Sequence, residues 1–266
     1  MNFDHAFYYL LIFVGGFIDS IAGGGGLITV PTIALIVGPG ALAIGTNKIV
    51  GAAAAGIALV VYARNGQFNF KQGIYFSLSV FFGSFIGSQI GSSLPNEYFR
   101  WLMIGICPLI LILVVRKDSL LKRAAVGHST TPGDAALAAA DVKIPKLSKM
   151  VLKLLLAGLC CGLYDGILGP GGGTIMLLSL LLFTTMPLLL AIGISKFANL
   201  LSATSALGGY ALHDQVDWNL GVVLAIFATA GAFIGSKIAS KKAAQIVRPT
   251  LILVVVLLFI KLVLES

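Results

Sequence analysis

The sequence predicts an all-α integral membrane protein made of two homologous halves. Of its 266 residues, 58% are hydrophobic and 11% are charged, and the mean hydropathy is +1.00. A soluble globule could not keep so much apolar surface out of water. The apolar runs are continuous rather than short and alternating, which favours membrane-spanning helices over a closed barrel of strands.

Apolar runs of suitable length divide the chain into three regions. About 20 helical residues are needed to cross a hydrocarbon layer of about 30 Å. Residues 1–116 form the first membrane repeat, residues 117–149 a polar, Ala-rich linker, and residues 150–266 the second repeat. Helical segments are expected near residues 6–22, 26–37, 41–63, 71–92 and 99–116, and again near residues 150–168, 173–184, 188–212, 219–239 and 249–264.

Polar landmarks recur in the same order in both halves. Asp19 aligns with Asp165, and Lys48 in "AIGTNK" aligns with Lys196 in "AIGISK". Further along, "YARNGQFNF" aligns with "YALHDQVDW", and "GSFIGS" aligns with "GAFIGS". Colinear polar landmarks of this kind indicate an internal duplication.

The distribution of Lys and Arg between the loops distinguishes parallel from inverted repeats. If residues 6–37 cross the membrane once, eleven basic residues fall on one side and five on the other. If residues 6–37 and 150–184 each fold back as a hairpin, fourteen fall on one side and two on the other. The sequence therefore predicts inverted repeats in the cell inner (plasma) membrane, each a glycine-broken hairpin followed by three transmembrane helices. The linker is expected in the cytoplasm, with both termini outside.

The two glycine runs are candidate anion-binding elements. "GFIDSIAGGGG" ends at Gly26, and its counterpart "GPGGG" spans Gly169–Gly173. Clustered glycines end one helix and free the next to begin at an angle, so that helix N-termini with free N–H groups face the bilayer midplane. Close helix packing alone is the alternative, as expected for "GSFIGSQIG". The substrate-binding candidates here are Gly24, Gly25, Gly26, Gly171, Gly172 and Gly173.

Asp19 and Asp165 lie inside apolar segments just before each glycine run. An ionised carboxylate at that depth is costly unless it is protonated, hydrogen-bonded to backbone N–H groups or paired with a cation. Two roles are therefore open for these acids: proton coupling, or a structural cap of the broken hairpin.

A second group of candidates lies at the start of the following helix in each half. Lys48 and Lys196 sit about 10 Å below the membrane surface by helical rise. They either contact an anion, or snorkel, or pair with an aspartate. Nearby hydroxyl and amide groups could donate hydrogen bonds to a small anion with several oxygens. The full set is Thr46, Asn47, Lys48, Ser195, Lys196 and Asn199.

These repeated motifs resemble the TauE/SafE family of sulfite exporters. The doubled aspartate and glycine hairpins, each followed by "AIGTNK" or "AIGISK" and then by a polar turn ending in "FNF" or "VDW", carry the resemblance over nearly the whole chain. It implies secondary transport of small sulfur-containing anions, such as sulfite or organosulfonates, without a bound cofactor. On that resemblance the glycine hairpins and the Asn47/Lys48 and Ser195/Lys196 neighbourhoods form the site. Pro170 departs from the first copy and makes the two hairpins unequal.

Other functions fit the sequence less well than transport. Two intramembrane aspartates could suggest an aspartyl protease, but Asp19 lies in "GFIDS" and the GxGD motif is missing. An anion channel is a further alternative. The three histidines show no metal-ligand spacing. The net charge of +8 is explained by topology and calls for no nucleic-acid partner. The expected partners are a small anion and the lipid bilayer, and no enzymatic activity is expected.

Overall fold

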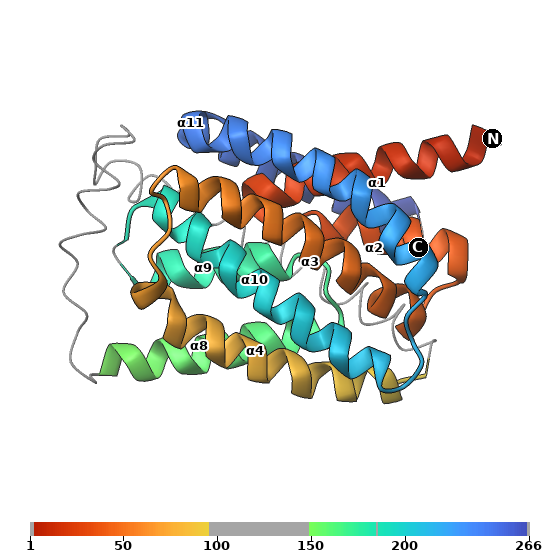
Figure 1. Cartoon of the computed structure of the whole chain (residues 1–266), viewed down its shortest axis with the longest axis horizontal. Helices are drawn as coiled ribbons and strands as arrows, with labels where there is room; N and C mark the ends of the chain where they lie inside the picture. Colours follow the sequence, from red (N-terminus) through yellow and green to blue (C-terminus); the bar gives the residue numbers. More distant parts are fainter. Residues whose placement is uncertain (1–2, 96–148, 185, 265–266) are drawn as a thin grey trace.

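The computed structural model describes residues 3–95, 149–184 and 186–264, and these form only helices and the turns between them. Figure 1 shows them as a bundle of long helices lying side by side. The helices are α1 (Phe3–Ala22), α2 (Gly26–Val37), α3 (Ala41–Arg64), α4 (Phe70–Ser93), α8 (Lys149–Ile167), α9 (Gly172–Phe183), α10 (Leu188–Ala211) and α11 (Trp218–Leu264).

The helix boundaries follow the sequence prediction closely, with one correction. The chain is helical from Trp218 to Leu264, where two segments, 219–239 and 249–264, were expected. The residues between them are mostly good helix formers, so the helix continues through this basic stretch. The predicted segment 99–116 and nearly all of the linker lie outside the described residues.

Four helices in the described part of the chain are long and apolar enough to cross a membrane. Each candidate span has 24 residues, and their mean hydropathies run from 1.3 to 1.9. They are Ala41–Arg64, Phe70–Ser93, Leu188–Ala211 and Trp218–Lys241. The helices α2 and α9 have only 12 residues each, which is too short to cross a bilayer. The predicted all-helical membrane architecture with short helices after each glycine run is therefore confirmed for these elements.

Glycines with positive φ break the chain between α1 and α2 and between α8 and α9. Gly23 has a φ of 82°, and Gly169 and Gly171 have φ values of 85° and 75°. Side chains disfavour this left-handed region, whereas glycine enters it without steric cost. Each break therefore lets the chain leave one helix and start a short one at an angle.

The long helices pack most extensively as α4 with α8 and α1 with α11, and α10 also packs against α4 and α3, while α3 packs against α11 (Figure 1). Small residues permit the close approach. Gly83 and Gly87 of α4 lie directly on the backbone of α8 at Leu159 and Leu163, where a Cβ atom would overlap it. The packing role expected for "GSFIGSQIG" is confirmed.

Equivalent contacts occur twice, first within each repeat and then between the repeats. Tyr62 donates a hydrogen bond to the Ser20 carbonyl at 2.8 Å, and its equivalent Tyr210 donates to the Gly166 carbonyl at 2.9 Å. In the turns after α3 and α10, the Gln67 amide donates to Ser240 O and the Gln215 amide to Ser92 O, at 2.9 and 3.0 Å. The repeats therefore pack against one another through matching surfaces.

The helices α3 and α10 run in opposite directions. Gly45, near the start of α3, lies against the Gln215 carbonyl beyond the end of α10. Gly193, near the start of α10, lies against the Gln67 carbonyl beyond the end of α3. In Figure 1, α2 and α9 likewise extend from the middle of the bundle toward opposite ends.

Candidate functional site

The two glycine breaks meet inside the bundle. The backbone of Gly23 lies against Gly173, so closely that a Cβ atom on Gly23 would overlap it. The Thr174 hydroxyl donates a hydrogen bond to the Ala22 carbonyl at 2.9 Å. Because α2 begins at Gly26 and α9 begins at Gly172, the N-termini of both short helices converge on one place.

Lys48 on α3 holds the aspartate of the other repeat. Its ammonium group lies 2.9 Å from Asp165 Oδ2 and donates to the Asp165 carbonyl at 2.5 Å. The Ser202 hydroxyl donates to the same Oδ2 atom at 2.6 Å. Lys48, Asp165 and Ser202 are all buried. This carboxylate is therefore satisfied by a full charge and by a hydroxyl group.

Lys196 on α10 makes the reciprocal ion pair. Its ammonium group lies 3.1 Å from Asp19 Oδ2 and donates to the Asp19 carbonyl. Asn199 Nδ2 reaches the same oxygen at 3.5 Å, and the backbone N–H of Gly25 donates to Asp19 Oδ1 at 3.3 Å. Asp19 therefore pairs with a cation and also caps the start of the second half of its own hairpin.

Each lysine thus pairs with an aspartate, which is one of the alternatives that the sequence left open. The pairing crosses between the repeats, since Lys48 meets Asp165 and Lys196 meets Asp19. The formal charges of the four side chains cancel. The positive field that remains comes from the N-termini of α2 and α9, where free N–H groups carry partial positive charge.

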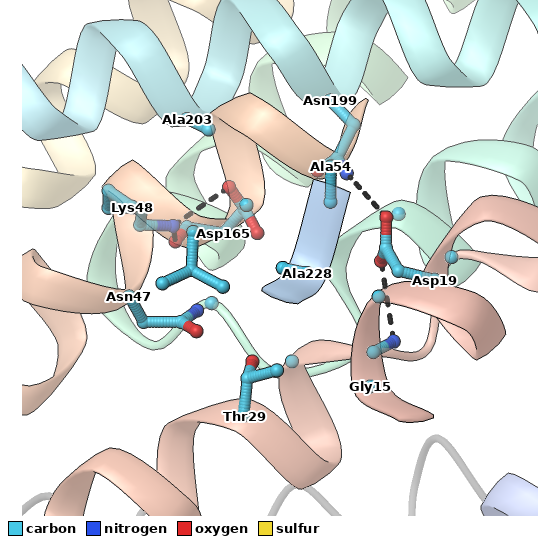
Figure 2. Close-up of a pocket in the computed structure, with 18 residues that line it drawn as sticks. Gly15, Asp19, Thr29, Asn47, Lys48, Ala54, Asp165, Asn199, Ala203 and Ala228 are labelled. Carbon is cyan, nitrogen blue, oxygen red and sulfur yellow. Dashed lines mark hydrogen bonds and ion pairs between the residues drawn. The ribbon is translucent and has the colours of Figure 1, made fainter. Parts of the chain in front are cut away.

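A pocket of about 40 Å³ lies between the two ion pairs. In Figure 2, Lys48 with Asp165 lies on one side and Asp19 with Asn199 on the other, and Asn47 and Thr29 point into the space between them. The predicted residues that line it are Asp19, Gly25, Gly26, Asn47, Lys48, Asp165, Gly173 and Asn199.

Asn47 is the polar group at the pocket that its surroundings leave unsatisfied. Only 6% of the residue is exposed, yet its side-chain oxygen has no hydrogen-bond partner in the described part of the chain. Buried polar groups are nearly always hydrogen-bonded, so an orphaned amide beside a cavity points to a ligand or to water.

Other predicted residues do not line the pocket. The Thr46 hydroxyl accepts a hydrogen bond from the Asp217 backbone N–H at 2.9 Å. Ser195 occupies the position equivalent to Asn47, but its hydroxyl donates to the Ile192 carbonyl at 2.8 Å. Both hydroxyl groups therefore already have partners. The other predicted residues that do not line the pocket are Gly24, Gly171, Gly172 and Lys196.

Sequence reasoning missed several residues around the pocket. Thr29 lies one turn after Gly26 in α2, and Ser202 lies one turn after Asn199 in α10. Helical spacing from the predicted residues could have found both. Small residues on the surrounding helices complete the wall, including Gly15, Gly51, Ala54, Ala203 and Ala228.

The arrangement suits binding of an anion better than hydrolysis. A protease dyad requires two carboxylates that share a proton, whereas here each carboxylate is paired with a lysine. In the ranges that the structure describes, no group of three or more His, Cys, Asp or Glu side chains is placed to hold a metal ion.

Comparisons with known proteins agree with this architecture. A protein from a Sinorhizobium species described as "Probable membrane transporter protein ORF9" is 31% identical over 97% of this chain and 91% of its own length. A "Probable membrane transporter protein" from Haemophilus influenzae is 28% identical over 98% of this chain and 95% of its own length. "Probable membrane transporter protein YfcA" from Escherichia coli K12 is 27% identical over 97% of this chain and 89% of its own length.

No solved structure matches this chain at a significant level. The sequence profile described as "Sulfite exporter TauE/SafE" matches residues 8–262, which is nearly the whole chain. Together with the apolar spanning helices, this match makes the protein a membrane transporter. The chain belongs to the TauE/SafE sulfite exporter family.

Proposed function

We propose that the protein is a secondary transporter of small sulfur-containing oxyanions, such as sulfite or organosulfonates, and that the central pocket is its substrate site. The observation that carries this proposal is the meeting of two opposed helix N-termini at one pocket, between ion pairs that join the two repeats. Helix N-termini bind anions through free N–H groups and the helix dipole.

The pocket suits a compact anion with several oxygens. Asn47 supplies an amide, and Lys48 supplies an ammonium group that already contacts a carboxylate. A volume of about 40 Å³ corresponds to about three or four water-sized groups, since one water needs about 10–15 Å³. A small oxyanion is comparable in size, whereas a bulky organic substrate would require the pocket to widen.

Transport is proposed to proceed by alternating access between inverted repeats. The opposite directions of α3 and α10 and of α2 and α9 support the inverted arrangement. Arg64 also shares one cavity with Lys237 and Lys241, although a topology of eight single crossings would place Arg64 across the membrane from both. Movement of one repeat against the other would break and re-form the ion pairs that cross between them.

The two aspartates are proposed to differ in role, with Asp19 as the proton-coupling group and Asp165 as a structural one. The Asp19 side chain is 11% exposed and lies 3.1 Å from its lysine, against 5% and 2.9 Å for Asp165. Asp165 is further held by Ser202, whose equivalent in the first repeat is Ala54. The two further donors to Asp19, Asn199 Nδ2 and the Gly25 N–H, lie farther from it, at 3.5 and 3.3 Å, than Ser202 Oγ lies from Asp165, at 2.6 Å. Asp19 is therefore held more loosely and is easier to release from its partner.

The test is flux in proteoliposomes that contain the purified protein. Sulfite, thiosulfate, sulfate, sulfoacetate and chloride are compared, with and without a pH gradient. Saturable flux of sulfite or sulfoacetate, at least tenfold faster than that of chloride, is expected. Asp19→Asn should abolish the response of the flux to the pH gradient. Asp165→Asn should lower the yield of folded protein, but the folded protein should still respond to the gradient. Equal flux of all anions, or a non-saturating current, would instead indicate a channel.

A further inference from the structure

We propose that a groove between the end of α3 and the middle of α11 binds an anionic phospholipid. The groove has a volume of about 750 Å³ and is separate from the central pocket. Three cationic side chains, Arg64, Lys237 and Lys241, line it together with apolar side chains. This inference does not depend on the transported anion.

Among the described residues, the cations of the groove have no acidic partner. Arg64, Lys237 and Lys241 are exposed, and no Asp or Glu lines the groove. Among the residues that the structure describes, none of the three forms an ion pair with a carboxylate. Lys237 lies over the Phe233 ring, 4.1 Å from its centroid, which holds one charge at the groove.

The remaining wall is apolar and faces outward from helices long enough to span the bilayer. Val60 is 43% exposed, and Phe233 and Ile238 are each 39% exposed. A phospholipid has the matching chemistry, because its acyl chains pack on apolar side chains while its phosphate meets cations near the membrane surface. A nucleic acid would not match the apolar part.

The repeat provides an internal comparison at the opposite end of the molecule. The positions equivalent to Arg64, Lys237 and Lys241 hold Leu212, Gln89 and Ser93, all uncharged. The fold therefore does not require cations at these positions. Their concentration in one groove, at one end only, fits the anionic surface of a single leaflet.

The experiment measures lipid retention by the full chain purified in a neutral detergent. Dioleoylphosphatidylglycerol and dioleoylphosphatidylcholine are titrated separately, and bound lipid is counted by native mass spectrometry. The variant Arg64→Gln/Lys237→Gln/Lys241→Gln should bind phosphatidylglycerol on the order of a hundredfold more weakly, since each cation near the surface contributes about a factor of five. The matched control Lys71→Gln/Lys153→Gln removes two exposed lysines outside the groove and should bind as the parent does.

Three results would overturn the proposal. They are equal phosphatidylglycerol binding by the triple variant, equal binding of phosphatidylcholine by the parent protein, and full competition by inorganic phosphate at the same concentration. Thermal unfolding in phosphatidylcholine checks that the variants fold. If the triple variant unfolds, the single changes Arg64→Gln and Lys241→Gln serve instead, each with an expected loss of about fivefold.

Discussion

At the scale of single residues, the two crossed ion pairs dominate the interior. Lys48 and Lys196 are 3% and 1% exposed, and each meets an aspartate from the other repeat. Buried ion pairs add little net stability, because desolvation offsets most of the attraction, yet removing one partner is costly. Such pairs would suit the proposed movement of one repeat against the other.

Removal of a single lysine is expected to destabilise the protein more than removal of the whole pair. Lys196→Met leaves Asp19 buried without its cation, which should lower the free energy of unfolding by about 3–5 kcal/mol. The double change Lys196→Met/Asp19→Asn should recover most of this loss. Thermal unfolding in detergent measures both, with Lys71→Met as an exposed control.

The corresponding changes at the pocket, Lys48→Met alone and with Asp165→Asn, separate pairing from substrate contact. If the lysine also contacts the anion, the stable double variant will still lack stabilisation by sulfite or sulfoacetate. Recovery of that stabilisation would show that the lysine serves only to neutralise the aspartate.

Asn47 and Ser195 occupy equivalent positions but should respond differently to substitution. Asn47→Ala removes the orphaned amide at the pocket and should weaken anion binding by about ten- to a hundredfold, since a hydrogen bond to a charged group is worth about 1.5–3 kcal/mol. Ser195→Ala removes a hydroxyl that is bound to Ile192 and should leave affinity unchanged. Substrate-dependent thermal shifts compare the two. Equal effects would contradict the asymmetric site.

At the scale of elements, the short helices α2 and α9 exist because glycine interrupts each hairpin. Gly23 and Gly169 take up positive φ values, and Gly25 and Gly172 lie against the aspartate of their own hairpin. The breaks therefore set both the direction of the helix N-terminus and the position of the carboxylate beside it.

A methyl group at Gly172 should disturb this junction. A Cβ atom there would overlap the Asp165 carboxylate, with Cγ at 2.7 Å, so Gly172→Ala should cost about 1–3 kcal/mol of stability and reduce transport. Gly208, in the last turn of α10, has no atom within 4 Å of its added Cβ. Gly208→Ala should therefore be neutral or stabilise by up to about 1 kcal/mol. Thermal unfolding and flux of the two variants test this contrast, and similar losses in both would count against it.

At the scale of the whole molecule, the opposite directions of α3 and α10 and the placement of charge both favour inverted repeats. Arg64, Lys237 and Lys241 gather at one end of the bundle, while the equivalent positions at the other end are uncharged. A basic end is expected at the cytoplasmic face. The turn after α3 and the turn after α10 should therefore face opposite sides of the membrane.

Cysteine labelling in a background without native cysteines tests this topology. Asn65 and Asp214 lie in these equivalent turns and are both exposed. Asp214→Cys should react with a membrane-impermeant thiol reagent added outside intact cells, because its turn is expected outside. Asn65→Cys, and Gly133→Cys in the linker, should react only after the membrane is opened. Labelling of Asn65→Cys and Asp214→Cys from the same side would exclude inverted repeats.

Local sequence patterns were sufficient to predict the helices and their breaks. Hydropathy over about 20 residues identifies a span, and consecutive glycines identify a break, because both depend on neighbouring residues only. The prediction therefore placed α2 at the residues where it occurs and came within one residue of α9. It also identified Asp19, Lys48 and their equivalents, because ionisable residues in an apolar segment are conspicuous.

Only the tertiary structure decided which of these residues meet. Sequence alone left the lysines as anion contacts, snorkelling groups or partners of an aspartate, and the packing of α3 and α10 against the opposite hairpin selected pairing across the repeats. Packing also turned Thr46 toward Asp217 and left the Asn47 amide at the pocket. These outcomes depend on contacts between residues more than a hundred positions apart, and helix docking rather than local propensity determines such contacts.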